Sequence, residues 1–135
     1  MEMVFFLAAV LVVGAILFAV ITMTKGGTKH LDVNKYRTKW LEIEQKLVKD
    51  DESSYQLSVL NADKLLDQAL REKGIMGETM GARMKVVKWS NANSVWTAHK
   101  LRNQIAHESD VDIDYVTARR ALASLKQGLK DIGAI

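Results

Sequence analysis

Residues 114–132 read DYVTARRALASLKQGLKDI, and this stretch decides the fold. Its apolar side chains recur every three or four residues, at Ala118, Leu122, Leu125, Leu129 and Ile132. Because an α-helix has about 3.6 residues per turn, this spacing gathers them on one stripe and leaves the charged side chains elsewhere. The stretch therefore predicts an amphipathic helix over 114–131 that buries one face and is ended by Gly133.

Three other stretches predict long helices of the same kind. The first covers 32–49, where Val33, Tyr36, Trp40, Ile43 and Leu47 form the apolar stripe. The second covers 53–73, with Ser53 and Gln56 as a capping box at its start and Gly74 at its end. The third covers 92–107, and a short helix is expected over 79–88. The chain has no proline to interrupt them. Four long helices with short connections predict an all-α fold built as an antiparallel four-helix bundle.

The N-terminal segment differs from the rest in its hydrophobicity. Residues 3–21 are apolar or small throughout, and Glu2 is the only charge before Lys25. A helix rises about 1.5 Å per residue, so this stretch matches a hydrocarbon core of about 30 Å. We therefore expect a single transmembrane helix as an anchor over 1–24, a juxtamembrane linker over 25–31 with a joint at Gly26-Gly27, and a helical domain over 32–135. A cleaved signal peptide is disfavoured because no basic residue precedes the apolar core.

The charges that flank this segment predict its orientation. Lys25, Lys29 and Lys35 follow it, and no basic side chain precedes it. The positive-inside rule then gives a single-pass membrane protein with its N-terminus outside and its C-terminal domain in the cytoplasm. The lipid bilayer is accordingly an expected partner.

Composition limits the chemistry of the remaining residues. The chain of 135 residues has no cysteine, which excludes disulfides and thiolate chemistry. Residues 25–135 hold all 19 basic residues and 15 of the 16 acidic ones, a milder excess than that of a dedicated nucleic-acid binder. His30 and His99 have no partners at metal-ligand spacing, so we expect no metal and no cofactor.

One basic stretch carries the candidate functional residues. Between Thr79 and His107 there is no acidic residue. Arg102 offers a phosphate-binding guanidinium, His107 an imidazole that exchanges protons near neutral pH, and Asn103 an amide that orients either one. Asn103 and His107 are four residues apart and share a helix face. These three are the candidate catalytic residues for phosphodiester cleavage without a metal, whereas the alternative is a histidine that merely caps or covers the helix end.

Four other side chains of this stretch are candidates for contacting a substrate. Lys100 and Lys88 are expected to bind substrate through their positive charge. Trp89 and Trp96 have aromatic faces on which bases stack, although core packing is the alternative, especially for Trp96.

The sequence Arg102-Asn103-Gln-Ile-Ala-His107 resembles the signature of HEPN (higher eukaryotes and prokaryotes nucleotide-binding) domains. In that signature an arginine, usually followed by a polar residue, precedes a histidine by a short gap, which is four residues here. The resemblance extends over about residues 32–132, because a four-helix arrangement with the motif late in the third long helix also fits the family.

The resemblance implies an all-helical domain that pairs as a homodimer, with the motif facing a cleft between protomers. Many HEPN domains are metal-independent endoribonucleases, in which residues matching His107, Arg102 and Asn103 assist attack by the 2′-hydroxyl, hold the scissile phosphate and orient the site. Other members only bind or act as scaffolds. Three hypotheses thus remain: a tethered ribonuclease acting on RNA, a tethered binding module for a nucleotide or for a protein encoded by a neighbouring gene, and a structural bundle without a ligand.

Overall fold

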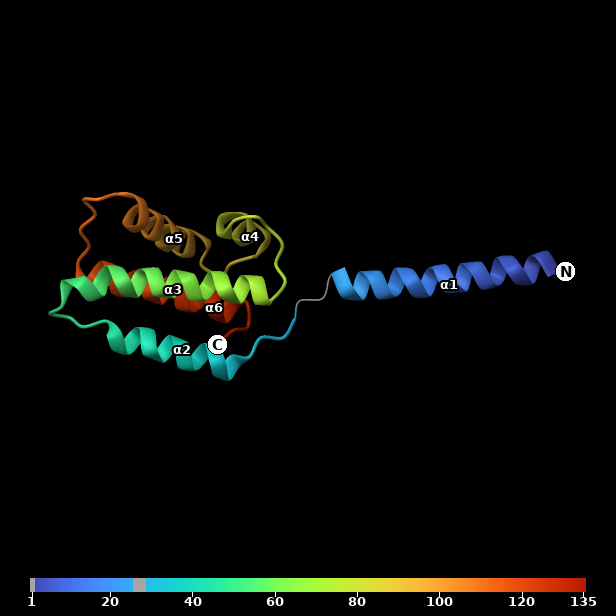
Figure 1. The fold of residues 1–135 in the computed structure, drawn as a ribbon, viewed down its shortest axis with the longest axis horizontal. Helices are drawn as coiled ribbons and strands as arrows, with labels where there is room; N and C mark the ends of the chain where they lie inside the picture. Colours follow the sequence, from blue (N-terminus) through green and yellow to red (C-terminus); the bar gives the residue numbers. More distant parts are fainter. Residues whose placement is uncertain (1, 26–28) are drawn as a thin grey trace.

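The computed structural model describes residues 2–25 and 29–135, of which 17–25 are described by their backbone alone, and these residues form helices without strands (Figure 1). The predicted joint at Gly26-Gly27 lies outside the described residues. The helices are α1 (Glu2–Lys25), α2 (Val33–Lys46), α3 (Glu52–Glu72), α4 (Met80–Val86), α5 (Ala92–His107) and α6 (Tyr115–Asp131). The predicted helices from residue 32 onward are all present, with boundaries that shift by up to three residues.

Most of these helices begin at a side chain that accepts a backbone N–H of the first turn. Asp32 caps α2 through Lys35 N at 3.2 Å, Thr79 caps α4 through Ala82 N at 3.1 Å, and Asp114 caps α6. Such caps satisfy donors that have no partner within the helix. Gly74 and Gly133 have φ of 86° and 78°, so the two glycines that were expected to end helices do adopt the left-handed conformation.

The predicted capping box at the start of α3 is wrong. Asp51, not Ser53, is the cap, and its carboxylate accepts the N–H of Ser53 at 3.1 Å. The Gln56 side chain is engaged elsewhere, because its Nε2 donates to the carbonyl of Val111 at 2.5 Å. This long-range bond ties α3 to the loop before α6.

The first long helix also ends earlier than predicted, at Lys46 instead of residue 49. Ser54 accepts a hydrogen bond from the N–H of Val48 at 3.0 Å, and the Tyr55 hydroxyl donates to the carbonyl of Lys49. Side chains of α3 thereby satisfy backbone groups that a longer α2 would have paired internally.

Helices α3 and α6 lie side by side through the middle of the helical domain, with α2 on one side and α5 and α4 on the other (Figure 1). Successive long helices from α2 onward alternate in direction. The buried core is supplied by these five helices and includes Tyr36, Leu66, Leu70, Leu125 and Leu129.

Gly128 allows α6 to approach its neighbours closely. A Cβ atom at this position would lie 3.2 Å from a methyl of Val95 on α5 and 3.4 Å from a methyl of Leu66 on α3. The Trp89 ring would be 3.3 Å away. Because Gly128 has no side chain, α6 can pack closely against both α5 and α3 at this position.

The expectation of a membrane anchor over 1–24 is corrected by the structure. Among the residues that the structure describes, no helix is long and apolar enough to cross a membrane. The expected single-pass topology depended on that anchor and is corrected with it.

Candidate functional site

The three candidate catalytic residues lie in the last two turns of α5. The guanidinium of Arg102 donates through Nη1 to Oδ1 of Asn103 at 3.0 Å, so the structure brings these two together. His107 is the last residue of α5 and is exposed. Asn103 and His107 share a helix face about 6 Å apart along the axis, whereas Arg102, five residues before His107, lies about 140° around the helix from it. No hydrogen bond joins His107 to either residue within the described part of the chain.

Of the two lysines expected to bind substrate, only Lys100 lies on the face of α5 that carries Asn103 and His107, three and seven residues before them. Lys100 is exposed on α5, two residues before Arg102 and therefore about 200° away around the helix. Lys88 is exposed in the connection between α4 and α5. Trp89 and Trp96 are half-buried and pack against the core, and the indole N–H of Trp89 donates to the carbonyl of Met84 at 2.9 Å.

A buried carboxylate from α3 lies beneath Arg102. Oδ2 of Asp63 forms an ion pair with Nε of Arg102 at 3.5 Å, and Oδ1 lies 3.0 Å from Nδ1 of His99. The side chains of Asp63 and His99 are only 3% and 8% exposed, whereas that of Arg102 is 37% exposed. Because an ionised carboxylate can only accept, Nδ1 of His99 carries the hydrogen. The Trp96 ring lies edge-on to the His99 ring, with the two ring centroids 6.2 Å apart.

One turn further along α3, a second carboxylate holds two arginines. Oδ1 of Asp67 accepts from Nη2 of Arg83 at 2.6 Å, and Oδ2 accepts from Nη2 of Arg71 at 2.5 Å. The Arg83 side chain is 8% exposed and also donates to the carbonyl of Gly77 at 2.7 Å. Arg83 thus links α4 to α3. Its charge is buried and paired, so it does not add to the exposed positive charge of the basic stretch between Thr79 and His107.

Spacing along α5 alone did not reveal Asp63, His99 or the pairing of Asp67 with Arg83. The partners of the two carboxylates lie 36 and 16 residues away in sequence. One signal was present: Asp63 stands four residues after Val59 and three before Leu66, on the buried stripe of α3. A charge at a buried position needs a partner, so an acid on an apolar stripe predicts a polar contact across the core.

Two cavities flank α5 on opposite sides. The first, of about 360 Å³, lies between α3 and α5 and opens over the Asp63–His99 pair. It is lined by Leu60, Asn61, Asp63, Lys64, Asp67, Arg71, Met80, His99 and Arg102.

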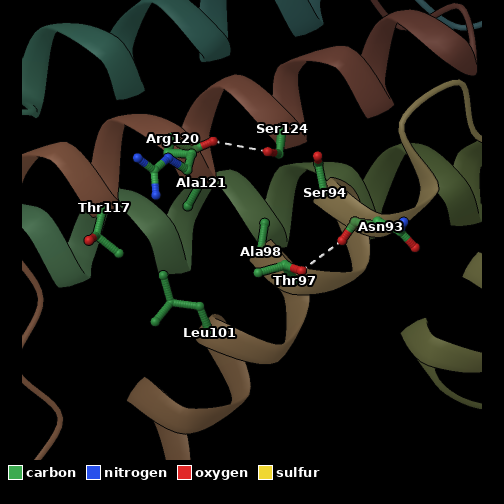
Figure 2. A pocket seen from close by; sticks show the side chains of 9 residues that line it. All are labelled: Asn93, Ser94, Thr97, Ala98, Leu101, Thr117, Arg120, Ala121 and Ser124. Carbon is green, nitrogen blue, oxygen red and sulfur yellow. Dashed lines mark hydrogen bonds between the residues drawn. The ribbon is translucent and has the colours of Figure 1, made fainter.

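The second cavity is a groove of about 250 Å³ between α5 and α6, and its lining side chains are mostly small (Figure 2). Figure 2 shows that the hydroxyls of Thr97 and Ser124 bond to carbonyls of their own helices, at Asn93 and Arg120. These hydroxyls are satisfied locally, so this groove offers less chemistry than the cavity between α3 and α5. Among the described residues, no three His, Cys, Asp or Glu side chains gather as metal ligands.

Comparison with family models, curated proteins and solved structures finds no match to this chain. The side chains themselves, above all the guanidinium of Arg102 held between Asp63 and Asn103, are therefore the basis for a function.

Proposed function

We propose that this chain binds RNA at the end of α5 and cleaves it without a metal, as its resemblance to HEPN domains implies. The observation that supports the proposal is the double anchoring of Arg102. Asp63 holds its Nε and Asn103 accepts from its Nη1. Of the five N–H groups of a guanidinium, three then remain without a partner in the described part of the chain.

An arginine held in this way suits a phosphate. A fixed planar fork donates two parallel hydrogen bonds to phosphate oxygens, and little side-chain entropy is lost on binding because the fork is already oriented. Arg102 holds the scissile phosphate and stabilises the charge that develops on it. His107 takes the proton of the attacking 2′-hydroxyl as the 2′-oxygen–phosphorus bond forms, and returns it to the 5′-oxygen that leaves as the phosphorus–5′-oxygen bond breaks. Asn103 holds the guanidinium in position by accepting from its Nη1.

A second candidate function, an RNA- or nucleotide-binding module without catalysis, is favoured by the exposure of His107. No hydrogen bond fixes its imidazole within the described residues, and its position at the helix end is equally suited to a cap. In this case Arg102 binds phosphate as before, and His107 takes no part in chemistry.

Single-turnover cleavage of a fluorescent RNA in excess EDTA separates the two functions. The ribonuclease predicts cleavage by the full chain, a loss of about 10²-fold or more in rate for His107→Ala, and a comparable loss for Arg102→Ala. His30→Ala and Arg37→Ala are the controls, because both residues are exposed and lie outside α5. RNA binding without cleavage by the wild-type chain favours the module, and equal cleavage by His107→Ala contradicts the ribonuclease.

A further inference from the structure

The cavity between α3 and α5 holds more positive than negative side chains. Its lining includes Lys64, Arg71 and Arg102 against Asp63 and Asp67. All four carboxylate oxygens already accept from, or pair with, a cationic or imidazole side chain. The negative charge in the wall is therefore fully engaged, and the cavity surface presents donors.

Several of these donors have no protein partner in the part of the chain that the structure describes. Arg102 keeps three free N–H groups, as stated above. Arg71 bonds to Asp67 through one Nη2 hydrogen only and is 66% exposed. No hydrogen bond is formed by the Lys64 ammonium with any described residue. The side chains of Lys64 and Arg71, seven residues apart on α3, lie on one face two turns apart and flank the opening.

Side-chain contacts hold the floor of the cavity in place. His99 is held by Asp63 at 3.0 Å and by the edge-on contact with Trp96. The volume of about 360 Å³ corresponds to about twelve water molecules, enough for a phosphate group with part of its hydration.

We propose that this cavity binds a phosphate monoester, with Arg102, Lys64 and Arg71 as its donors. A monoester carries about −1.5 to −2 charge at pH 7, whereas a phosphodiester carries −1, so the excess of cations favours the monoester. The ligand is either the terminal phosphate of an oligonucleotide, which is a monoester, or inorganic phosphate, whose oxygens offer the same acceptors.

The inference goes beyond the proposed function and shares only Arg102 with it. His107 takes no part in the monoester site, since it is not among the residues that line the cavity. Cleavage therefore tests one proposal and monoester binding the other. Loss of cleavage in His107→Ala leaves monoester binding unchanged.

The test uses the full chain and three probes: inorganic phosphate, a 2′-O-methyl RNA hexamer with a 5′-phosphate, and the same hexamer without it. The 2′-O-methyl groups prevent cleavage by removing the attacking hydroxyl. Calorimetric titration is expected to show that the 5′-phosphate tightens hexamer binding about tenfold. Weak binding of inorganic phosphate with no preference between the hexamers assigns the site to free phosphate.

Variants locate the site. Lys64→Ala and Arg71→Ala each weaken phosphate-dependent binding about fivefold to tenfold, while Lys49→Ala and Arg37→Ala, which change exposed residues elsewhere, have no effect. NMR spectra are expected to show phosphate-induced shifts at the Nε–H of Arg102 and the ring protons of His99. The proposal is overturned if none of the phosphate-bearing probes binds, or if the four variants bind phosphate equally.

Discussion

At the scale of single residues, Asp63 organises the candidate site. One carboxylate orients both the imidazole of His99 and the guanidinium of Arg102 from a position that is 2% exposed. Removing one member of a buried charged network leaves the others desolvated and unpaired, which costs more than the network contributes.

Replacing Asp63 is therefore expected to destabilise the fold strongly. Asp63→Ala lowers the free energy of unfolding by about 3–5 kcal/mol, because the buried His99 loses its acceptor and Arg102 loses its ion-pair partner. Urea denaturation followed by circular dichroism measures the change. Asp112→Ala, in the exposed loop before α6, is the control and stays within about 0.5 kcal/mol of wild type. A loss below about 1 kcal/mol for Asp63→Ala would show that the network is not organised as described.

Gly77 precedes α4 and Gly81 lies within it, so alanine substitutions at these two glycines form a matched pair. A Cβ at Gly77 would lie 2.8 Å from the backbone N of Arg83, whereas the nearest such contact at Gly81 is 3.9 Å, to the Thr79 hydroxyl. Gly77→Ala is expected to cost about 1–3 kcal/mol because it displaces the segment that Arg83 holds. Gly81→Ala is neutral or stabilises by up to about 1 kcal/mol, since alanine favours helix. Thermal unfolding of both variants checks the prediction, and equal melting temperatures would contradict it.

At the scale of helices, the sequence predicted most of the helices observed, because the signals for a helix lie within its own residues. The apolar stripes, the glycines at 74 and 133, and the position of α5 depend on residues within one helix. The errors come from long-range contacts: Ser54 and Tyr55 of α3 shorten α2, and Gln56 bonds to Val111 instead of closing a capping box. The Asp63–His99 pair joins two helices and is likewise invisible to spacing within either one.

A polar clamp between α2 and α3 makes a pH-dependent prediction. Hydrogen bonds from Tyr36, Lys35 and Gln68 lower the pKa of Glu72 to about 2. The pKa of Tyr36 is raised, first by burial of its hydroxyl and then by the neighbouring Glu72 carboxylate. Because the folded pKa lies below the ordinary value of 4.5, the clamp stabilises the fold fully above about pH 4.5 and loses this contribution as the pH falls toward 2.

The variant Glu72→Gln tests this clamp. At pH 7 it is expected to be less stable than wild type by a modest amount, about 1 kcal/mol or less, because Glu72 is 38% exposed and screened by solvent. The difference shrinks between pH 4.5 and 2 as the wild-type carboxylate is protonated. Urea titrations across this range measure it, with Glu42→Gln, an exposed residue of α2, as the control. A difference that stays constant over the range would contradict the assignment.

At the scale of the whole molecule, the resemblance implies a homodimer, and the structure offers a place where it would form. The end of α5 and the starts of α3 and α6 lie at the same end of the helical domain (Figure 1). Leu57 and Val116, near the starts of α3 and α6, are 54% and 60% exposed. Contiguous exposed apolar surface marks interaction sites, so we expect these two side chains to contribute to the contact between protomers.

The expected dimer can be measured directly. Sedimentation equilibrium of the chain, whose mass is 15.1 kDa, is expected to give twice that mass for wild type and a shift toward monomer for Val116→Glu. Val86→Glu, at an equally exposed position on α4, is the control and leaves the dimer intact. A monomeric wild-type chain, or a shift in the control alone, would contradict pairing through this end.

The most direct test of the account is the chemistry of the RNA ends that the chain produces. Attack by a 2′-hydroxyl at a phosphate held by Arg102, with proton transfer at His107, predicts 2′,3′-cyclic phosphate termini in excess EDTA, detected by mass spectrometry. These termini are expected from the wild-type chain and from His30→Ala and to be absent for His107→Ala. Cleavage that requires a divalent metal, or that leaves 3′-hydroxyl ends, would contradict the role given to these side chains.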